Sequence, residues 1–218
     1  MLDYIVGFNR IILLTKEEKM GFDLYGMNPY NPNKAIKPKL DWDKTTTEEQ
    51  RKKYFEEEDK YQKEVVGDYF RNNVWWWRPL ASYVIKFTGC VEEEDAQMWS
   101  ENGGHEVDDQ TAKQIHNQLM VLIESGHTKK FEDDYEKERL KAEKHNDKVE
   151  KELEKFCKSV EKKLGKTNVA PNDFPKADKD KWDDIWNKRE WTASYPFSVE
   201  NVKEFAEFCK FSGGFTIC

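Results

Sequence analysis

Apolar residues recur at helical spacing in the centre of the chain, between an acid that can cap a helix and a glycine that can end one. Asp108 and Gly126 are these two boundaries. Between them, intervals of 3 and 4 residues separate the apolar positions Ile115, Leu119, Leu122 and Ile123. This is the period of one face of an α-helix. The pattern predicts an amphipathic helix after Asp108.

Capping signals mark two more helices. Thr46 with Glu49, and Thr47 with Gln50, both fit the capping box, which predicts a helix from about residue 47 to 66. Near the other end, Ser198 precedes an apolar face that Gly213-Gly214 closes, formed by Val202, Phe205, Ala206, Phe208 and Cys209. The tail after this helix, residues 215–218, fits a short strand.

The densest aromatic segment is YFRNNVWWWRPLASYVIKF, residues 69–87. Proline is tolerated near the start of a helix, so Pro79 predicts a helix over Leu80–Phe87 that is entered at Arg78 or Pro79. Three consecutive indoles cannot share one helical face. At least one of them is therefore expected to keep accessible surface.

Charged residues dominate residues 128–166, where the apolar positions form only a thin seam near coiled-coil spacing: Val149, Leu153, Phe156, Val160 and Leu164. The segment predicts one long helix or a helical hairpin bent near Asn146. Residues 168–181 contain two prolines and fit a linker, and a short aromatic helix with Trp182, Ile185 and Trp186 is expected to follow.

These elements predict a mainly α fold: a single helical domain with an aromatic core, a protruding charged helix or helical hairpin, and at most a short strand pair. We expect residues 1–19 to be a poorly ordered N-terminal extension and residues 20–127 to form the core helical region. Residues 128–190 are expected to form a charged helical arm with its linker. Residues 191–218 are expected to form a C-terminal helix and tail that pack on the core.

Composition limits the classes of function. With 36 basic and 43 acidic residues the formal net charge is −7, which argues against nucleic acid as a partner of the whole surface. Apolar runs are too short for a membrane helix, so we expect no membrane partner. The N-terminus does not fit a signal peptide, and the cysteines, which fit no CxxC pair, are expected to be reduced thiols of a cytoplasmic protein: Cys90, Cys157, Cys209 and Cys218.

Three separated strings carry a family resemblance: MGFDLYG at 20–26, YFRNNVWWWRPL at 69–80, and YPFSVENVKEFAEFC at 195–209 followed by SGGF. Together they resemble a family of uncharacterised proteins from bacteriophages and environmental bacteria. Some relatives carry paired CxxC-like knuckles where this chain has its charged span, so no zinc role transfers. The resemblance implies a viral or virus-derived source, with the host cytoplasm as location, and it implies no catalytic residue.

A Trp-rich cluster is the main candidate for a ligand or partner site. Indole faces stack planar or cationic groups, and asparagine and arginine add planar hydrogen bonds. The candidate residues are Arg71, Asn72, Asn73, Trp75, Trp76, Trp77, Arg78 and His105. The alternative is that the indoles are core, that the two asparagines cap the following helix, and that Arg78 pairs with a carboxylate such as Asp68.

His105 lies beside Glu106, Asp108 and Asp109 after a Gly-Gly turn, but the spacing fits no EF-hand loop and no HExxH helix. We therefore predict no metal and no cofactor. A solvated acidic loop with helix-capping acids is the plainer interpretation.

Three functions compete. The first is an accessory protein that acts by binding a protein partner through its aromatic surface or its charged arm. The second is an enzyme or small-molecule-binding protein with a pocket around residues 72–78, and the lack of a local catalytic signature favours the first over it. The third, single-strand nucleic-acid binding by exposed indoles with Arg71 and Arg78, fits the aromatic residues but not the net charge.

Overall fold

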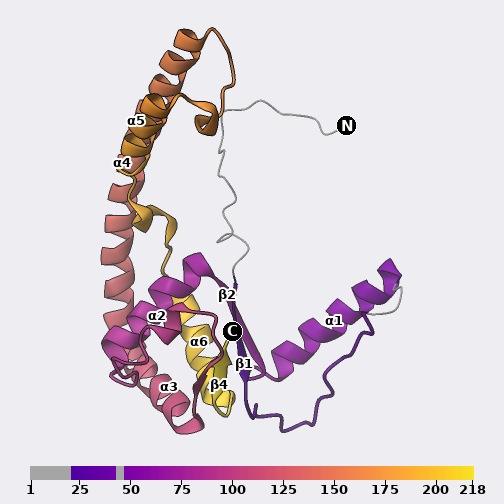
Figure 1. Cartoon of the computed structure of the whole chain (residues 1–218). Helices are drawn as coiled ribbons and strands as arrows, with labels where there is room; N and C mark the ends of the chain where they lie inside the picture. Colours follow the sequence, from indigo (N-terminus) through magenta and orange to yellow (C-terminus); the bar gives the residue numbers. More distant parts are fainter. Residues whose placement is uncertain (1–20, 43–46) are drawn as a thin grey trace. The chain divides into compact units, whose positions relative to one another are not determined.

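A computed structural model describes residues 21–42 and 47–218 (Figure 1). The predicted extension at residues 1–19 and the capping residue Thr46 lie outside this range. The chain divides into two compact units. Unit 1 combines the residues up to Val121 with Glu200–Cys218, and unit 2 comprises Leu122–Val199.

Unit 1 is built around a four-stranded antiparallel sheet. Its strands are β1 (Gly21–Gly26), β2 (Tyr69–Asn73), β3 (His105–Val107) and β4 (Phe215–Ile217), in the order β2-β1-β4-β3. The predicted strand at residues 215–218 is confirmed as β4. The prediction of at most a strand pair is wrong, because β1 and β2 also pair and β3 adds to the edge of β4.

Helices supply most of the rest of unit 1: α1 (Glu48–Glu64), α2 (Val74–Thr88), α3 (Asp109–Glu124), α6 (Val199–Phe211) and the short η2 (Met98–Ser100). The predicted capping boundaries are confirmed at two of them. Thr47 and Gln50 form the reciprocal capping box of α1. Before α3, Asp108 Oδ1 accepts a 2.8 Å hydrogen bond from the Thr111 amide.

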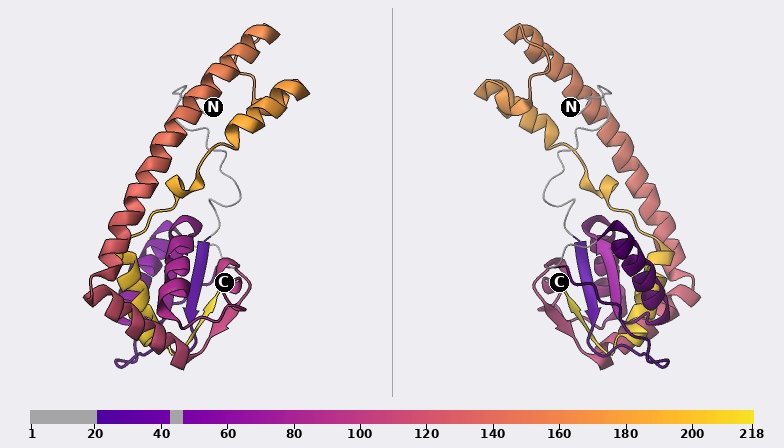
Figure 2. Two further views of the ribbon diagram at one scale, coloured as in Figure 1. Left: turned by 90° about the vertical axis from the view of Figure 1, so that its left-hand side faces the viewer. Right: turned by 90° about the vertical axis from the view of Figure 1, so that its right-hand side faces the viewer.

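One face of the sheet is covered by helices, and α2 and α6 lie on that side in both views of Figure 2. Phe22 on β1 stacks on Trp77 of α2, with ring centroids 5.4 Å apart. Phe70 on β2 contacts Phe205 and Phe208 of α6. This aromatic cluster is the core of unit 1, as the mainly α prediction with an aromatic core required.

Helix α2 begins earlier than its proline suggested. It starts at Val74, five residues before Pro79, because Asn73 caps it: Asn73 Oδ1 accepts from the amides of Trp75 and Trp76, each at 3.1 Å. Pro79 lies buried in the second turn, where its missing amide hydrogen removes one helical hydrogen bond. The predicted entry at Arg78 or Pro79 is therefore wrong.

Unit 2 is a helical hairpin. Its elements are α4 (His127–Leu164), η3 (Pro171–Asp173), α5 (Lys176–Trp186) and η4 (Trp191–Ser194). For residues 128–166 the sequence allowed one long helix or a hairpin bent near Asn146. One long helix is correct, because α4 continues unbroken through Asn146. The predicted linker ends earlier than residue 181, because α5 starts directly after Pro175. Helix α5 runs antiparallel to α4, since Lys163 pairs with Asp178 while Glu150 pairs with Arg189.

Candidate functional site

The Trp-rich segment contributes both to the core of unit 1 and to its surface. Trp77 is fully buried, and its Nε1 donates a 2.7 Å hydrogen bond to the Trp99 carbonyl. Trp99 stacks on the same indole at 5.9 Å. Trp75 and Trp76 keep part of their surface accessible. One indole is thus the hydrophobic centre, while its two neighbours lie at the boundary with solvent.

The two asparagines have different partners. Asn73 caps α2, which is the local role that the sequence left open as an alternative. Asn72 faces the other way and donates from Nδ2 to Asn201 Oδ1 of α6 at 2.9 Å. This contact joins strand β2 to the first turn of α6, so Asn72 helps to position that helix on the sheet.

The other candidate residues lie apart. Arg71 is on the edge strand β2, whereas His105 is on β3 at the opposite edge, with β1 and β4 between them. His105 is in register with the buried Ile217, so its side chain belongs to the helix-covered side of the sheet. Arg78 is half-buried on α2. A site formed by all eight candidates is therefore not contiguous.

The outer face of the sheet carries a row of accessible side chains that the sequence analysis did not single out. Strand pairing aligns Tyr69 with Tyr25, Tyr25 with Thr216, and Thr216 with Glu106. Tyr25 is 46% exposed, and its ring lies 5.3 Å from that of Tyr69. The row crosses all four strands, so it forms one continuous polar and aromatic strip.

A second row lies beside the first. Asp23 is in register with Arg71, whose Nε lies 3.4 Å from Asp23 Oδ1, and the arginine side chain is 61% exposed. The Tyr69 hydroxyl donates to the same carboxylate oxygen. Burial, followed by the hydrogen bond to Asp23 and the charge of that carboxylate, raises the pKa of Tyr69. Tyr69 therefore stays a neutral donor. We call these six residues the outer sheet face: Asp23, Tyr25, Tyr69, Arg71, Glu106 and Thr216.

A local signal for this face exists in the sequence. In GFDLYG the apolar Phe22 and Leu24 alternate with Asp23 and Tyr25, which is the period of a half-buried strand. The same alternation places Phe70 inward and Arg71 outward on β2. Read as strands, these strings predict which side chains share the outer face.

A polar cluster lies near the base of α1. Asp68 accepts from three donors: Lys37 Nζ at 2.6 Å, the Tyr61 hydroxyl at 3.3 Å and Gln62 Nε2 at 3.2 Å. Burial and the neighbouring Asp68 charge raise the pKa of Tyr61. Tyr61 and Gln62 belong to α1, and Lys37 belongs to the loop at residues 27–42. The cluster therefore anchors both α1 and this loop to Asp68.

Two histidines lie against backbone carbonyls, and one cysteine belongs to the core of unit 1. Nowhere in residues 21–42 and 47–218 do three His, Cys, Asp or Glu side chains gather as metal ligands. His116 Nδ1 lies 2.9 Å from the Ala206 carbonyl, and His145 Nε2 lies 2.9 Å from that of Lys188. Complete burial raises the pKa of the Cys209 thiol well above its ordinary value. This thiol is therefore a protonated core residue.

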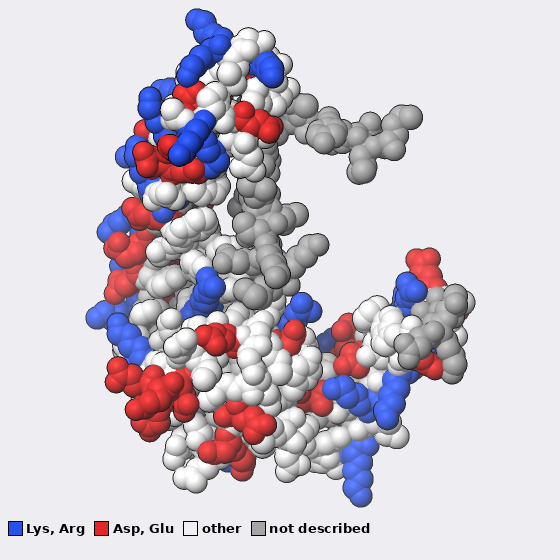
Figure 3. All heavy atoms as spheres, viewed as in Figure 1, with Lys and Arg blue, Asp and Glu red and all other residues white. Residues whose placement is uncertain are grey.

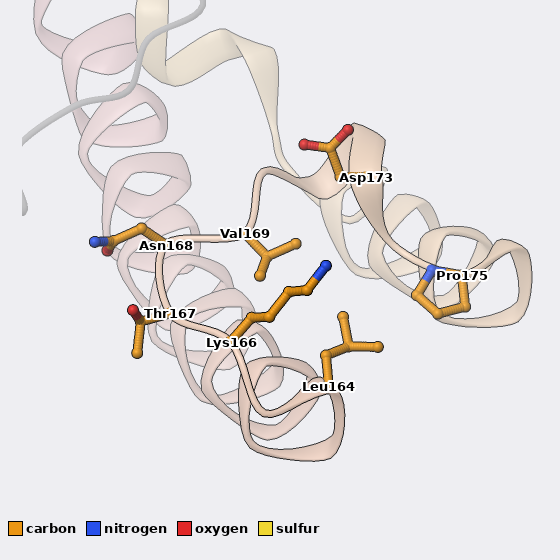
Figure 4. A pocket seen from close by; sticks show the side chains of 7 residues that line it. All are labelled: Leu164, Lys166, Thr167, Asn168, Val169, Asp173 and Pro175. Atoms are coloured by element: carbon orange, nitrogen blue, oxygen red, sulfur yellow. The ribbon is translucent and has the colours of Figure 1, made fainter.

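Unit 2 has an open hollow of about 660 Å³ in the loop between α4 and α5 (Figure 4). In Figure 4, Lys166 extends past Leu164 and Val169, while Thr167 and Asn168 point away. Lys166 and Asp173 are the only charged residues among those that line it. The hollow therefore combines one cation and one anion with the aliphatic side chains of Leu164, Val169 and Pro175.

Comparisons with protein-family models, curated proteins and solved structures find no match to this chain. No helix among the described residues is long and apolar enough to cross a membrane.

Proposed function

We propose that this chain is a binding protein that docks a partner protein on the outer sheet face. The observation that carries the proposal is the register Tyr69–Tyr25–Thr216–Glu106, which lines up accessible side chains across four strands while the opposite face is buried under helices. Tyrosines are enriched in protein interfaces because their rings are apolar and their hydroxyls form hydrogen bonds.

The charges of this face favour a protein over a nucleic acid. Its acids are Asp23 and Glu106, and its single base, Arg71, already pairs with Asp23. Tyr25, Tyr69 and Arg71 resemble the base-stacking residues of some four-stranded RNA-binding sheets, but phosphates would meet two carboxylates here. A mildly basic protein surface complements the two carboxylates of the outer sheet face better than a nucleic acid does.

The size of the face sets an expected affinity. Four strands about 4.8 Å apart span roughly 14 Å, which is narrow for a stable interface. We therefore expect a transient complex with a micromolar dissociation constant. The phage source and the pocket at residues 72–78 remain predictions beside this proposal.

Site-specific photo-crosslinking tests the proposal. A photoreactive phenylalanine analogue is placed at Tyr25 in the full chain and, as a control, at Ser82, which is exposed on α2. Partners that crosslink at position 25 only are then purified, and their dissociation constants are measured with Thr216→Arg and with the matched Ser82→Arg.

The proposal requires a purified protein whose binding weakens at least about tenfold with Thr216→Arg and stays unchanged with Ser82→Arg. It is overturned if both arginine variants bind alike, or if salt-sensitive oligonucleotide binding is the activity that Thr216→Arg removes.

A further inference from the structure

The second half of α4 carries a straight row of lysines. The row comprises Lys144, Lys148, Lys151, Lys155, Lys158 and Lys162. Their spacings of 4, 3, 4, 3 and 4 residues place them on one line of an α-helix, which rises 1.5 Å per residue. The row is therefore about 27 Å long. Figure 3 shows that charged side chains dominate the surface of α4.

The lysine row lies directly opposite the buried side of α4. Val149, Leu153 and Val160 are buried on that side, and Phe174 next to Phe156 closes over it. Residues 151 and 153 are separated by two steps of the helix, so they project from opposite sides. All six lysines are exposed, as this position requires.

Ion pairing of the bases differs between the two halves of α4. In the first half three lysines pair with acids three or four residues away: Lys129 with Asp133 at 2.9 Å, Lys137 with Asp134 at 2.8 Å, and Lys141 with Glu138 at 2.7 Å. In the row, Lys158 alone has such a pair, with Glu154 at 2.6 Å. The other five lysines form no ion pair with a carboxylate of the described residues.

Two of the nearby carboxylates are occupied by bases outside the row. Arg189 Nη2 lies 2.9 Å from Glu150, and Lys188 Nζ lies 2.8 Å from Glu152. Both bases belong to the segment after α5, so the hairpin itself draws these two acids away from the row. The row keeps a net positive charge.

The row also affects the helix itself. Like charges at spacings of three and four residues destabilise a helix. The row contains five such pairs in sequence, and the carboxylates of Asp147 and Glu154 at the same spacings offset part of the repulsion. An anionic partner that covers the row relieves the remaining repulsion.

We propose that the lysine row binds an acidic α-helical segment of a partner protein, in a site separate from the outer sheet face. A helix with carboxylates at spacings of three and four residues repeats its charge at the same interval as the row. Lysines favour such point-charge pairing, whereas the row has no arginine for bidentate phosphate binding and no aromatic residue for base stacking.

The partner must be narrow. A second line of α4, formed by Asp147, Glu150, Glu154 and Glu161, runs beside the row. A wide anionic surface, such as a bilayer or a DNA duplex, would meet these carboxylates as well as the lysines. A single helix, about 10 Å across, contacts the row without them.

The test uses a fluorescein-labelled helical peptide of about 20 residues with glutamates at spacings of three and four on one face. A control peptide has the same composition with the glutamates distributed around the helix. Binding to the full-length chain is followed by fluorescence anisotropy, with a single-stranded oligonucleotide and phosphatidylserine vesicles as comparison probes.

Two triple variants with equal charge change are compared. The first, Lys148→Glu with Lys151→Glu and Lys155→Glu, reverses the row. The second, Lys129→Glu with Lys137→Glu and Lys141→Glu, reverses paired lysines on the same helix. Circular dichroism verifies that both variants keep their helix content.

We expect the patterned peptide to bind more tightly than the control peptide, with roughly tenfold or greater weakening in the row variant and little change in the paired-lysine variant. The proposal is overturned if the wild-type chain binds neither peptide, if both variants lose binding equally, or if the oligonucleotide or the vesicles bind the row more tightly than the patterned peptide.

Discussion

Unit 1 and unit 2 are each stabilised internally, but by different kinds of interaction. Unit 1 buries stacked rings against one face of a sheet, and Trp77 alone contacts Phe22, Trp99 and Phe205. Unit 2 has a thin apolar seam and relies on polar side chains of α4 that bond the backbone of the returning segment. The contrast shows how a segment with few large apolar residues still obtains a defined path.

The polar bonds of unit 2 follow one another along α4. Glu132 Oε1 accepts from the Val199 amide, and Arg139 donates to the Ala193 carbonyl. Asn146 makes two bonds to Glu190: its Nδ2 donates to the carbonyl and its Oδ1 accepts from the amide, both at 2.9 Å. The bonds to the Glu190 and Val199 amides satisfy backbone donors at the start of η4 and α6, where no helical acceptor is available.

The largest expected difference in stability between the two units comes from a substitution at Trp77. Trp77→Ala is expected to destabilise unit 1 by about 3–5 kcal/mol, because it leaves a cavity and an unsatisfied Trp99 carbonyl. Denaturant unfolding measures the loss, and reaction of Cys209 with a thiol reagent reports the opening of unit 1. The half-buried Cys157 of unit 2 should react at an unchanged rate. Equal acceleration of both thiols would mean that the units unfold as one.

The second largest expected effect is at Gly67, where two backbone segments of unit 1 approach each other closely. A Cβ at Gly67 would overlap the backbone of Phe211, whereas nothing lies within 4 Å of a Cβ built at Gly103. Gly67→Ala is expected to cost about 3 kcal/mol in thermal or denaturant unfolding, and Gly103→Ala to be nearly neutral. Similar losses in the two variants would contradict this packing.

In unit 2 the corresponding test removes a polar contact. Asn146→Ala deletes both bonds to Glu190 and is expected to destabilise the hairpin by about 1–2 kcal/mol. Hydrogen exchange at the Glu190 amide should accelerate, while the amides of β1 keep their protection. Asp147→Ala, at the exposed neighbouring position, is the control and should leave this amide protected.

Alkaline pH tests the outer sheet face. The pKa of Tyr69 is raised in the folded state, so its contribution is present below the ordinary tyrosine pKa of 10 and is lost as the pH rises above that value. Tyr69→Phe should therefore flatten the decline of stability above pH 10. Parallel pH profiles for wild type and variant would show that Tyr69 ionises as freely as in the unfolded chain.

The smallest expected effect is a gain. Lys155→Glu replaces two repulsive contacts in the lysine row, with Lys151 and Lys158, by attractive ones, and it gives up one attraction at the same spacing, to Glu152. We expect about 0.3 kcal/mol of added stability for unit 2. Thermal unfolding followed by circular dichroism measures it, and Lys137→Glu, which breaks the pair with Asp134 and repels Asp133, should lower stability instead.

Local signals predicted the helices well. The capping box of Thr47 and the capping acid Asp108 predict the starts of α1 and α3, and the spacing of Ile115 and Leu119 predicts the buried side of α3. These signals lie within one turn of the residues they affect, so the sequence contains them directly. The predicted start of α2 is wrong because proline is tolerated in the second turn of a helix, so Pro79 does not mark the boundary.

Strand pairing was harder to predict. β3 has three residues and no distinctive pattern, and it pairs with β4 more than 100 residues later in the chain. The candidate site shares this difficulty, because Tyr25, Tyr69 and Thr216 meet only through the sheet register. Alternation in GFDLYG would have placed Tyr25 outward, but nothing local pairs it with Thr216.

The position of β4 between β1 and β3 has a consequence for the order of folding. The ribosome makes β4 after every other element of unit 1, and the whole of unit 2 is synthesised before it. Unit 2 consists of contacts between neighbouring helices, which form quickly, whereas the sheet depends on distant contacts, which form slowly. A growing chain can therefore form the helical hairpin of unit 2 before β4 is available. Until then β1, with Phe22 and Leu24, cannot be joined to β3.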